Sequence, residues 1–117
     1  MNTYMLLLSH APDRYSDLSE DDYMTIIADY IAWTEKLTAE GIYTGGEKLA
    51  DGPGKLLQKT DSGVEVHDSP MAELAEVLGG VMMIKAADYD AAVEIAKTCP
   101  HMVHNNSLEI REIHDVD

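Results

Sequence analysis

The sequence predicts an α+β fold in a single domain, 1–117, and three observations support this prediction. Short apolar runs that are typical of strands alternate with two longer segments of helical periodicity. A pair of short strand-like runs separated by turn residues lies near the middle of the chain, as expected for a hairpin. The chain has 117 residues, 45% of them apolar, which suffices for one hydrophobic core.

The first strand is predicted over Thr3–Ser9, a nearly continuous apolar run typical of a strand in the middle of a sheet. After a polar loop, Ser19 is predicted to cap a helix, because Asp22 completes a helix-start signature and acidic residues suit the positive end of the helix dipole. Apolar residues then recur with helical spacing as far as Leu37. Gly41 is predicted to end this helix.

The middle of the chain is predicted to consist of strands. Ile42–Leu49 forms the second strand, in which the paired Gly45 and Gly46 indicate a bulge or a close backbone approach. Lys55–Thr60 and Val64–His67 are predicted to form a hairpin.

The last third of the chain predicts a strand, a helix and a final strand. Gly79-Gly80 is expected to open the strand Val81–Lys85. Asp88 then caps a second helix, which Pro100 is predicted to end because the residue before a proline is pushed out of the helical region. Ser107–Ile113 alternates apolar and polar residues, as in a strand with one solvated face.

This order of elements matches the ferredoxin-like βαββαβ plan with an extra hairpin. In this plan the helices cover one face of the sheet and leave the other face open. Small domains of this kind commonly cover the open face by dimerising, so a homodimer is expected.

Charge and composition exclude several classes of partner. There are 22 acidic and 8 basic residues, a net charge of −14, which disfavours nucleic acids and anionic membranes. No apolar run approaches the length of a membrane span, and Met5–Leu8 is too short for a signal-peptide core. A soluble cytoplasmic protein is therefore expected. Cys99 is the only cysteine, so it forms no intrachain disulfide, and it is expected to be buried.

Several stretches along nearly the whole chain carry a family resemblance through their order and spacing. They are Tyr4–Leu8, Tyr30–Leu37, Gly45–Leu49, Val66–Met71, Ala72-Glu73, Leu78–Gly80 and Leu108–Arg111. Together they resemble the YCII-related, or DGPF-domain, family. The resemblance implies a ferredoxin-like protomer that pairs into a dimeric α/β barrel, with a polar pocket in each protomer. It also implies enzyme-like features, with a His–Asp pair in some members.

The sequence departs from the family pattern at two places. The Asp-Gly-Pro-Phe motif is here Asp68-Ser69-Pro70-Met71, so a thioether replaces the aromatic wall of the pocket. The positions of the family's His–Asp pair correspond to Tyr30 and Cys99. The chemistry of that pair therefore does not carry over to this chain.

His101 and Asp68 are predicted to be catalytic. Histidine is the side chain best suited to move a proton near neutral pH, and the segment that holds His101 leads into an edge of the same sheet. It is expected to approach the Asp68 loop of the same chain or of a partner, where the carboxylate would orient the imidazole or hold a substrate hydroxyl. The alternative is an exposed loop histidine and an aspartate that only forms a turn.

Four further residues are predicted to bind substrate: Tyr30, Trp33, Glu47 and His104. A tyrosine hydroxyl facing a pocket would donate to a developing oxyanion, although both aromatic residues also suit the core. The Glu47 carboxylate would point inward at the Gly45-Gly46 bulge or remain solvated. The two histidines after Pro100, with Asp68 or Glu47, form too weak a pattern for zinc, so no metal and no cofactor is predicted. His10 is expected to be a loop residue.

Two functions remain open. A small enzyme of lyase, isomerase or hydrolase type would act by proton transfer on a small organic molecule, such as a phenolic or carbonyl compound, with His101 as acid and base. A non-catalytic dimeric module would instead bind a small ligand or a protein partner. The missing His–Asp pair favours the second function, whereas the polar pocket that the resemblance implies favours the first.

Overall fold

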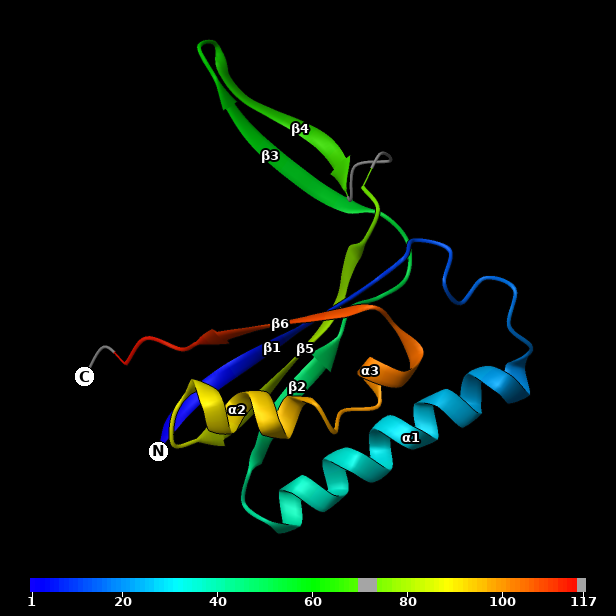
Figure 1. Cartoon of the computed structure of the whole chain (residues 1–117). Helices are drawn as coiled ribbons and strands as arrows, with labels where there is room; N and C mark the ends of the chain where they lie inside the picture. The colour runs from blue at the N-terminus through cyan, green and yellow to red at the C-terminus, as the bar shows by residue number, and fades with distance from the viewer. Residues whose placement is uncertain (70–73, 116–117) are drawn as a thin grey trace.

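The computed structural model describes residues 1–69 and 74–115, which form an α+β structure (Figure 1). In chain order the elements are β1 (Asn2–His10), α1 (Glu20–Ala39), β2 (Tyr43–Lys48), β3 (Gly54–Thr60), β4 (Gly63–Ser69), β5 (Val77–Ala86), α2 (Tyr89–Ala96), α3 (His101–His104) and β6 (Ser107–Glu112). Four strands form one sheet in the order β2-β5-β1-β6, and β3 pairs with β4 in a separate hairpin.

The four-stranded sheet has β1 at its centre, as predicted, with antiparallel neighbours β5 and β6. Strand β2 pairs antiparallel with β5 and forms the opposite edge. This order is compatible with the predicted ferredoxin-like plan. Within the described residues the sheet remains open at β2 and β6, so one chain forms no closed barrel. The dimeric α/β barrel remains an expectation for two chains.

The core lies between one face of this sheet and the helices. Alternate residues of β1 and β5 point into it, and α1, α2 and the segment after α2 cover them. The core residues include Tyr4, Leu6, Leu8, Trp33, Leu37, Met82, Ile84, Ala92, Ala96 and Cys99. Cys99 is 1% exposed, which confirms its predicted burial.

Both long helices begin at the predicted caps. The Ser19 hydroxyl accepts a hydrogen bond from the Asp22 backbone N–H at 3.1 Å, and the Asp88 carboxylate accepts one from the Ala91 N–H at 2.8 Å. Gly41 follows α1 with a φ of 75°, a conformation that glycine adopts without strain. None of the helices in the described residues combines the length and the apolar character that crossing a membrane requires.

The strand predictions around the glycine pairs are confirmed in outline. The register of β2 against β5 shifts between Tyr43 and Gly45, so the predicted bulge is present. The hairpin strands β3 and β4 also lie where predicted. Gly79 and Gly80 lie inside β5 instead of opening it, because the pairing with β1 starts at Val77.

Three details after α2 and in β4 differ from the sequence-based expectations. The helix α2 ends at Ala96, and Pro100 precedes a new one-turn helix, α3, instead of ending α2. Proline suits the start of a helix because the first N–H groups of a helix need no intrahelical partner. Asp68 lies within β4 and pairs with Lys55, so it forms no turn after a strand. The predictions for Pro70, Met71, Ala72-Glu73 and the end of the polar tail at 116–117 fall outside the described residues.

Candidate functional site

A cavity of about 260 Å³ lies between α1 and the ends of β1, β2 and β5. Aliphatic side chains form much of its wall, among them Leu8, Ile26 and Ile27. Four phenols and two imidazoles also line it, namely Tyr15, Tyr23, Tyr30, Tyr43, His10 and His101. A mostly apolar wall with a few converging polar groups is the usual form of a small-molecule site.

Two glycines make room for aromatic side chains at this cavity. A Cβ atom at Gly46 would lie 2.7 Å from the Tyr43 hydroxyl and 2.6 Å from the Val81 carbonyl oxygen. A Cβ atom at Gly79 would lie 2.5 Å from Cδ2 of the His10 ring. The glycine pairs of β2 and β5 therefore let a phenol and an imidazole lie directly over the strands.

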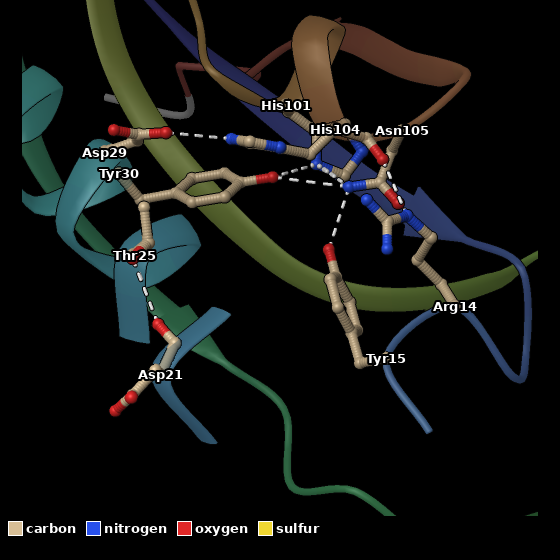
Figure 2. A network of polar contacts seen from close by, with 9 residues as sticks. All are labelled: Arg14, Tyr15, Asp21, Thr25, Asp29, Tyr30, His101, His104 and Asn105. Carbon is tan, nitrogen blue, oxygen red and sulfur yellow. Dashed lines mark hydrogen bonds and ion pairs between the residues drawn. The ribbon is translucent and has the colours of Figure 1, made fainter. Parts of the chain in front are cut away.

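The innermost polar contact of the cavity joins α1 to α3. The Tyr30 hydroxyl lies 2.9 Å from Nδ1 of His101 (Figure 2). Nε2 of His101 lies 2.8 Å from the Ser9 carbonyl oxygen. A carbonyl only accepts, so Nε2 carries the proton and donates it to Ser9. In the neutral ring Nδ1 is then an acceptor, and the Tyr30 hydroxyl donates to it.

Asn105 ties this pair to a second phenol. Its amide Nδ2 lies 2.8 Å from the Tyr15 hydroxyl, 3.3 Å from the Tyr30 hydroxyl and 3.4 Å from Nδ1 of His101 (Figure 2). The Asn105 protons can serve both phenol oxygens, and the Tyr30 proton serves His101. Because Asn105 donates to the oxygen of Tyr15, the Tyr15 hydroxyl remains able to donate its own proton to a ligand oxygen.

The loop that carries Tyr15 is hydrogen-bonded to α3. Nε of Arg14 donates to the His104 carbonyl oxygen at 2.8 Å, and the Arg14 guanidinium lies 5.2 Å from the centre of the Tyr15 ring. The polar segment after β1 carries no periodic signal in the sequence, so sequence analysis missed Tyr15. Contacts with the segment around α3 and with the rings of His10 and Tyr23 place its phenol at the cavity.

Burial shifts the titration of the cluster toward neutral forms. Burial lowers the pKa of His101, although hydrogen bonds to backbone groups, that of Ser9 first, partly oppose this. Burial, assisted by the neighbouring Tyr15, raises the pKa of Tyr30 well above its usual value. The pKa of Tyr43 is raised as well, by burial first and then by the charge of Glu47. Neutral imidazole and neutral phenol are therefore the resting state near pH 7.

His10 is a residue of this site that sequence analysis assigned to a loop. It ends β1, and its Nδ1 lies 2.7 Å from the Ala11 carbonyl oxygen, so Nδ1 carries a proton in the neutral ring. Nε2 then has a free lone pair, and no hydrogen bond within residues 1–69 and 74–115 occupies it. The ring packs edge-to-face on Tyr15 with 5.3 Å between ring centres. In the sequence, the position of His10 at the end of a predicted buried strand is the one feature that could have indicated a site residue.

The structure does not bring the predicted pair His101 and Asp68 together within one chain. The Asp68 carboxylate lies on the hairpin, where it forms an exposed ion pair with Lys55 at 2.8 Å. His101 is 3% exposed and uses both ring nitrogens on Tyr30 and Ser9, so it is not the exposed loop residue of the alternative reading. Their proposed roles in catalysis stay predictions.

The four residues predicted to bind substrate divide between cavity and surroundings. Tyr30 and Glu47 border the cavity. Trp33 lies in the core, where its indole N–H donates to the Thr98 hydroxyl at 2.9 Å. His104 lies behind Tyr30 and contacts the Asp29 carboxylate at 2.9 Å, outside the cavity lining (Figure 2).

In the part of the chain that the structure describes, no three His, Cys, Asp or Glu side chains gather as metal ligands would. His101 and His104, the two histidines of the weak pattern considered above, face different partners, Tyr30 and Asp29. The polar side chains that line the cavity are phenols and imidazoles together with Glu47, Lys48 and Asp51, and they suit hydrogen bonding and proton transfer.

Comparison with known proteins places the chain in a family. No curated protein matches it significantly. The family model described as YCII-related domain matches residues 3–117, which is essentially the whole chain. The stretches from Tyr4–Leu8 to Leu108–Arg111 that carry the resemblance lie within this match. The chain therefore belongs to the YCII-related family.

Proposed function

We propose that the cavity binds a small carbonyl or phenolic molecule and moves a proton on it, with His10 as the base and Tyr15 as the hydrogen-bond donor. The observation that carries this proposal is the packing of an imidazole with a free Nε2 against a phenol whose oxygen accepts from Asn105, at 5.3 Å between ring centres. A base and a donor side by side at the wall of one cavity are the components of general acid–base catalysis.

The proposed step is the removal of a proton from the carbon next to a carbonyl group. Nε2 of His10 takes the proton, and the electron pair of the C–H bond forms the C=C bond of an enolate. The oxygen that becomes negative accepts the hydrogen bond of Tyr15, as in an oxyanion hole. Return of the proton from His10 to another atom of the same molecule gives an isomer, so no further reactant is consumed.

His101 acts in this proposal as a positioning residue. Its ring is almost fully buried and both nitrogens are engaged, so it does not reach the ligand itself. By accepting the Tyr30 proton it frees the Asn105 amide to serve the phenol oxygens and so orients Tyr15. Tyr30 borders the cavity and supplies a further hydrogen-bonding oxygen to the ligand.

The size and lining of the cavity limit the class of ligand. A volume of about 260 Å³ lies just below the usual range of ligand sites, which starts at roughly 300 Å³, so the ligand must be small. Leu8, Ile26 and Ile27 favour an apolar body, and the phenols favour one or two oxygen atoms. Lys48 and Asp51 also line the cavity and pair with each other at 3.3 Å, so together they favour neither an anionic nor a cationic ligand. A compact ring that bears a carbonyl or hydroxyl group fits this description.

Binding is tested with 4-nitrophenol, whose colour reports ionisation and whose phenolate resembles an enolate. We expect the wild type to bind the phenolate and Tyr15→Phe to bind it about fivefold more weakly, the equivalent of one hydrogen bond of ~1 kcal/mol. His67→Gln is the matched control, because His67 lies on the hairpin and outside the cavity lining. Equal affinity in wild type and Tyr15→Phe contradicts the assigned donor.

Catalysis is tested by the exchange of the α-protons of 2-cyclohexen-1-one with deuterium in heavy water, followed by NMR. We expect the wild type to accelerate exchange and His10→Gln to lose at least ~100-fold of that acceleration, the usual range for a general base. Binding of nitrophenolate without any accelerated exchange would support the non-catalytic binding module, the second function that the sequence leaves open.

We also propose that the protein works as a homodimer in the cytoplasm. The sheet face opposite the helices carries the partly exposed side chains of Met5, Leu7, Val81 and Met83. The chain exposes 8069 Å², whereas a compact 12.9 kDa monomer exposes about 6,300 Å². The excess of about 1,800 Å² exceeds the ~800 Å² that each partner of a standard interface buries. Sedimentation velocity at micromolar concentration tests this, and a monomer there would refute it.

A further inference from the structure

The hairpin β3–β4 is separated from the rest of the structure. Its two strands pair only with each other, and Figure 1 shows the ribbon projecting from the sheet. Nearly all its residues are exposed, with Leu56, Thr60 and Ser69 half-buried. The projection enlarges the molecule, because the radius of gyration is 16.4 Å, whereas a compact chain of this length has about 13 Å. An isolated two-stranded hairpin is only marginally stable in water, so a covering surface is expected.

One face of the hairpin is apolar. Leu57 and Val66 are cross-strand partners, and Val64 lies two residues before Val66 on the same face. These three side chains are 63%, 61% and 64% exposed. The opposite face carries Gln58, Glu65 and His67 together with the half-buried Leu56. An apolar cluster on a projecting element, with a polar reverse side, is the mark of a surface that docks on a protein.

The charge of the hairpin indicates what the partner is. Strand β3 carries two of the eight basic residues of the chain, Lys55 and Lys59, and no acidic residue. Both lysines lie beside Leu57 on the apolar face, where Asp68 pairs with Lys55 at 2.8 Å, so the two lysines and one aspartate leave this face with a net charge of +1. The chain as a whole has a net charge of −14, so a second copy offers an acidic surface to this basic strand.

We propose that the hairpin β3–β4 is an arm that packs the face of Leu57, Val64 and Val66 on a second copy of this chain. The two copies exchange arms reciprocally, as two-fold symmetry requires, so each arm contact occurs twice in the dimer. This inference rests on the proposed homodimer and adds the element that holds it together. The exposed area in excess of a compact monomer, about 1,800 Å², is large enough for the arm and the open sheet face together.

The test compares substitutions on the two faces of the arm. Leu57→Ser, Val64→Ser and Val66→Ser are combined in one variant, and Gln58→Ser with His67→Ser forms the matched control. We expect the apolar-face variant to raise the dimer dissociation constant at least ~100-fold, as the loss of three interface side chains would, and the control to leave it unchanged. Sedimentation velocity measures both, and Trp33 fluorescence reports whether the core remains folded.

The outcomes separate the two proposals. Equal dimer dissociation constants for the wild type and the apolar-face variant would overturn the proposed arm and leave the homodimer proposal intact. A monomeric wild type overturns both.

A second measurement does not depend on the stability of that variant. A photo-reactive maleimide is attached to Leu57→Cys, since the native Cys99 is buried and escapes the reagent. We expect cross-links between isotopically light and heavy chains in a mixed dimer. Cross-links within single chains alone would overturn the arm.

Discussion

The Tyr30 hydroxyl on α1 lies 2.9 Å from Nδ1 of His101 on α3, although the two residues are 71 positions apart in the chain. The two residues lie where α1 meets the short helix after α2, and the Ser9 carbonyl of β1 determines which ring nitrogen carries the proton. One contact therefore connects two helices and the central strand at the wall of the cavity. Several testable properties depend on it.

The burial of neutral His101 predicts a loss of stability in acid. The pKa of His101 is lowered in the folded protein, whereas an unfolded histidine titrates near ~6.5, so below that pH the unfolded chain binds one more proton. Stability from this group is present above the unfolded pKa and is lost as the pH falls toward the folded pKa, by at most ~1.4 kcal/mol per pH unit.

Urea unfolding between pH 5 and pH 7.5, at one protein concentration, measures this effect. His101→Gln should remove part of the pH dependence, and the exposed His114→Gln should not. Identical pH profiles for wild type and His101→Gln would show that the imidazole is protonated to the same extent in the folded and unfolded states.

Asp68→Asn should leave the titration of His101 unchanged. The carboxylate lies on the hairpin and pairs with Lys55, whereas His101 contacts Tyr30 and Ser9. Stability should change by less than ~1 kcal/mol, because the ion pair is exposed. NMR titration of the histidines measures this, and a shift of the His101 pKa in the variant would show that Asp68 of a second copy reaches it.

The thiol of Cys99 should be unreactive in the folded protein. Its side chain is 1% exposed, and burial raises the pKa of the thiol to about 11, so little thiolate forms at pH 8. We expect no reaction with a disulfide reagent such as Ellman's reagent at pH 8, and one equivalent after addition of urea. A rapid stoichiometric reaction of the native protein would contradict this.

Thr98→Val should destabilise the core by about 1–3 kcal/mol, because it leaves the buried indole N–H of Trp33 without its acceptor. Trp33 is the only tryptophan, so its fluorescence follows unfolding directly. The variant Thr25→Val, at an exposed position on α1, is the control and should change stability by no more than ~0.5 kcal/mol. Equal midpoints for both variants would contradict the role of this hydrogen bond.

Gly46→Ala should both destabilise the protein, by about 1–3 kcal/mol, and weaken ligand binding. The added Cβ would lie 2.6 Å from the Val81 carbonyl oxygen and 2.7 Å from the Tyr43 hydroxyl, and both atoms belong to residues that line the cavity. Gly54→Ala is the control, since its nearest neighbour is the Ser69 hydroxyl on the hairpin. Thermal unfolding and 4-nitrophenol titration measure both effects.

Most elements were predictable because their signals are local. The cap at Ser19, the glycine after α1 and the apolar run of β1 each determine an element through neighbouring residues alone. The short helix α3 was not predicted, since Pro100 reads equally well as the end of one helix or the start of another. The hairpin was predicted as an element, but its projection away from the sheet was not.

The candidate site was predictable only in part, because its members come from distant segments. The histidine after Pro100 and the tyrosine on the first helix were predicted as site residues, and the structure brings them together. Tyr15 and His10 were missed, since a polar loop and a strand end carry no pattern that indicates a cavity. Asp68 was predicted to accompany His101, but its strand belongs to the hairpin, which extends away from the sheet.

The sequence by itself determined the fold class, the capped helices, the central strand, the acidic surface and the family resemblance, because each depends on residue types and on short-range spacing. Only the tertiary structure decided which polar groups meet. The tautomer of His101, the orientation of the Tyr15 hydroxyl and the free nitrogen of His10 all depend on a hydrogen bond to one particular neighbour. Such contacts form when the packing of the helices on the sheet brings side chains into hydrogen-bond distance, and no local pattern specifies them.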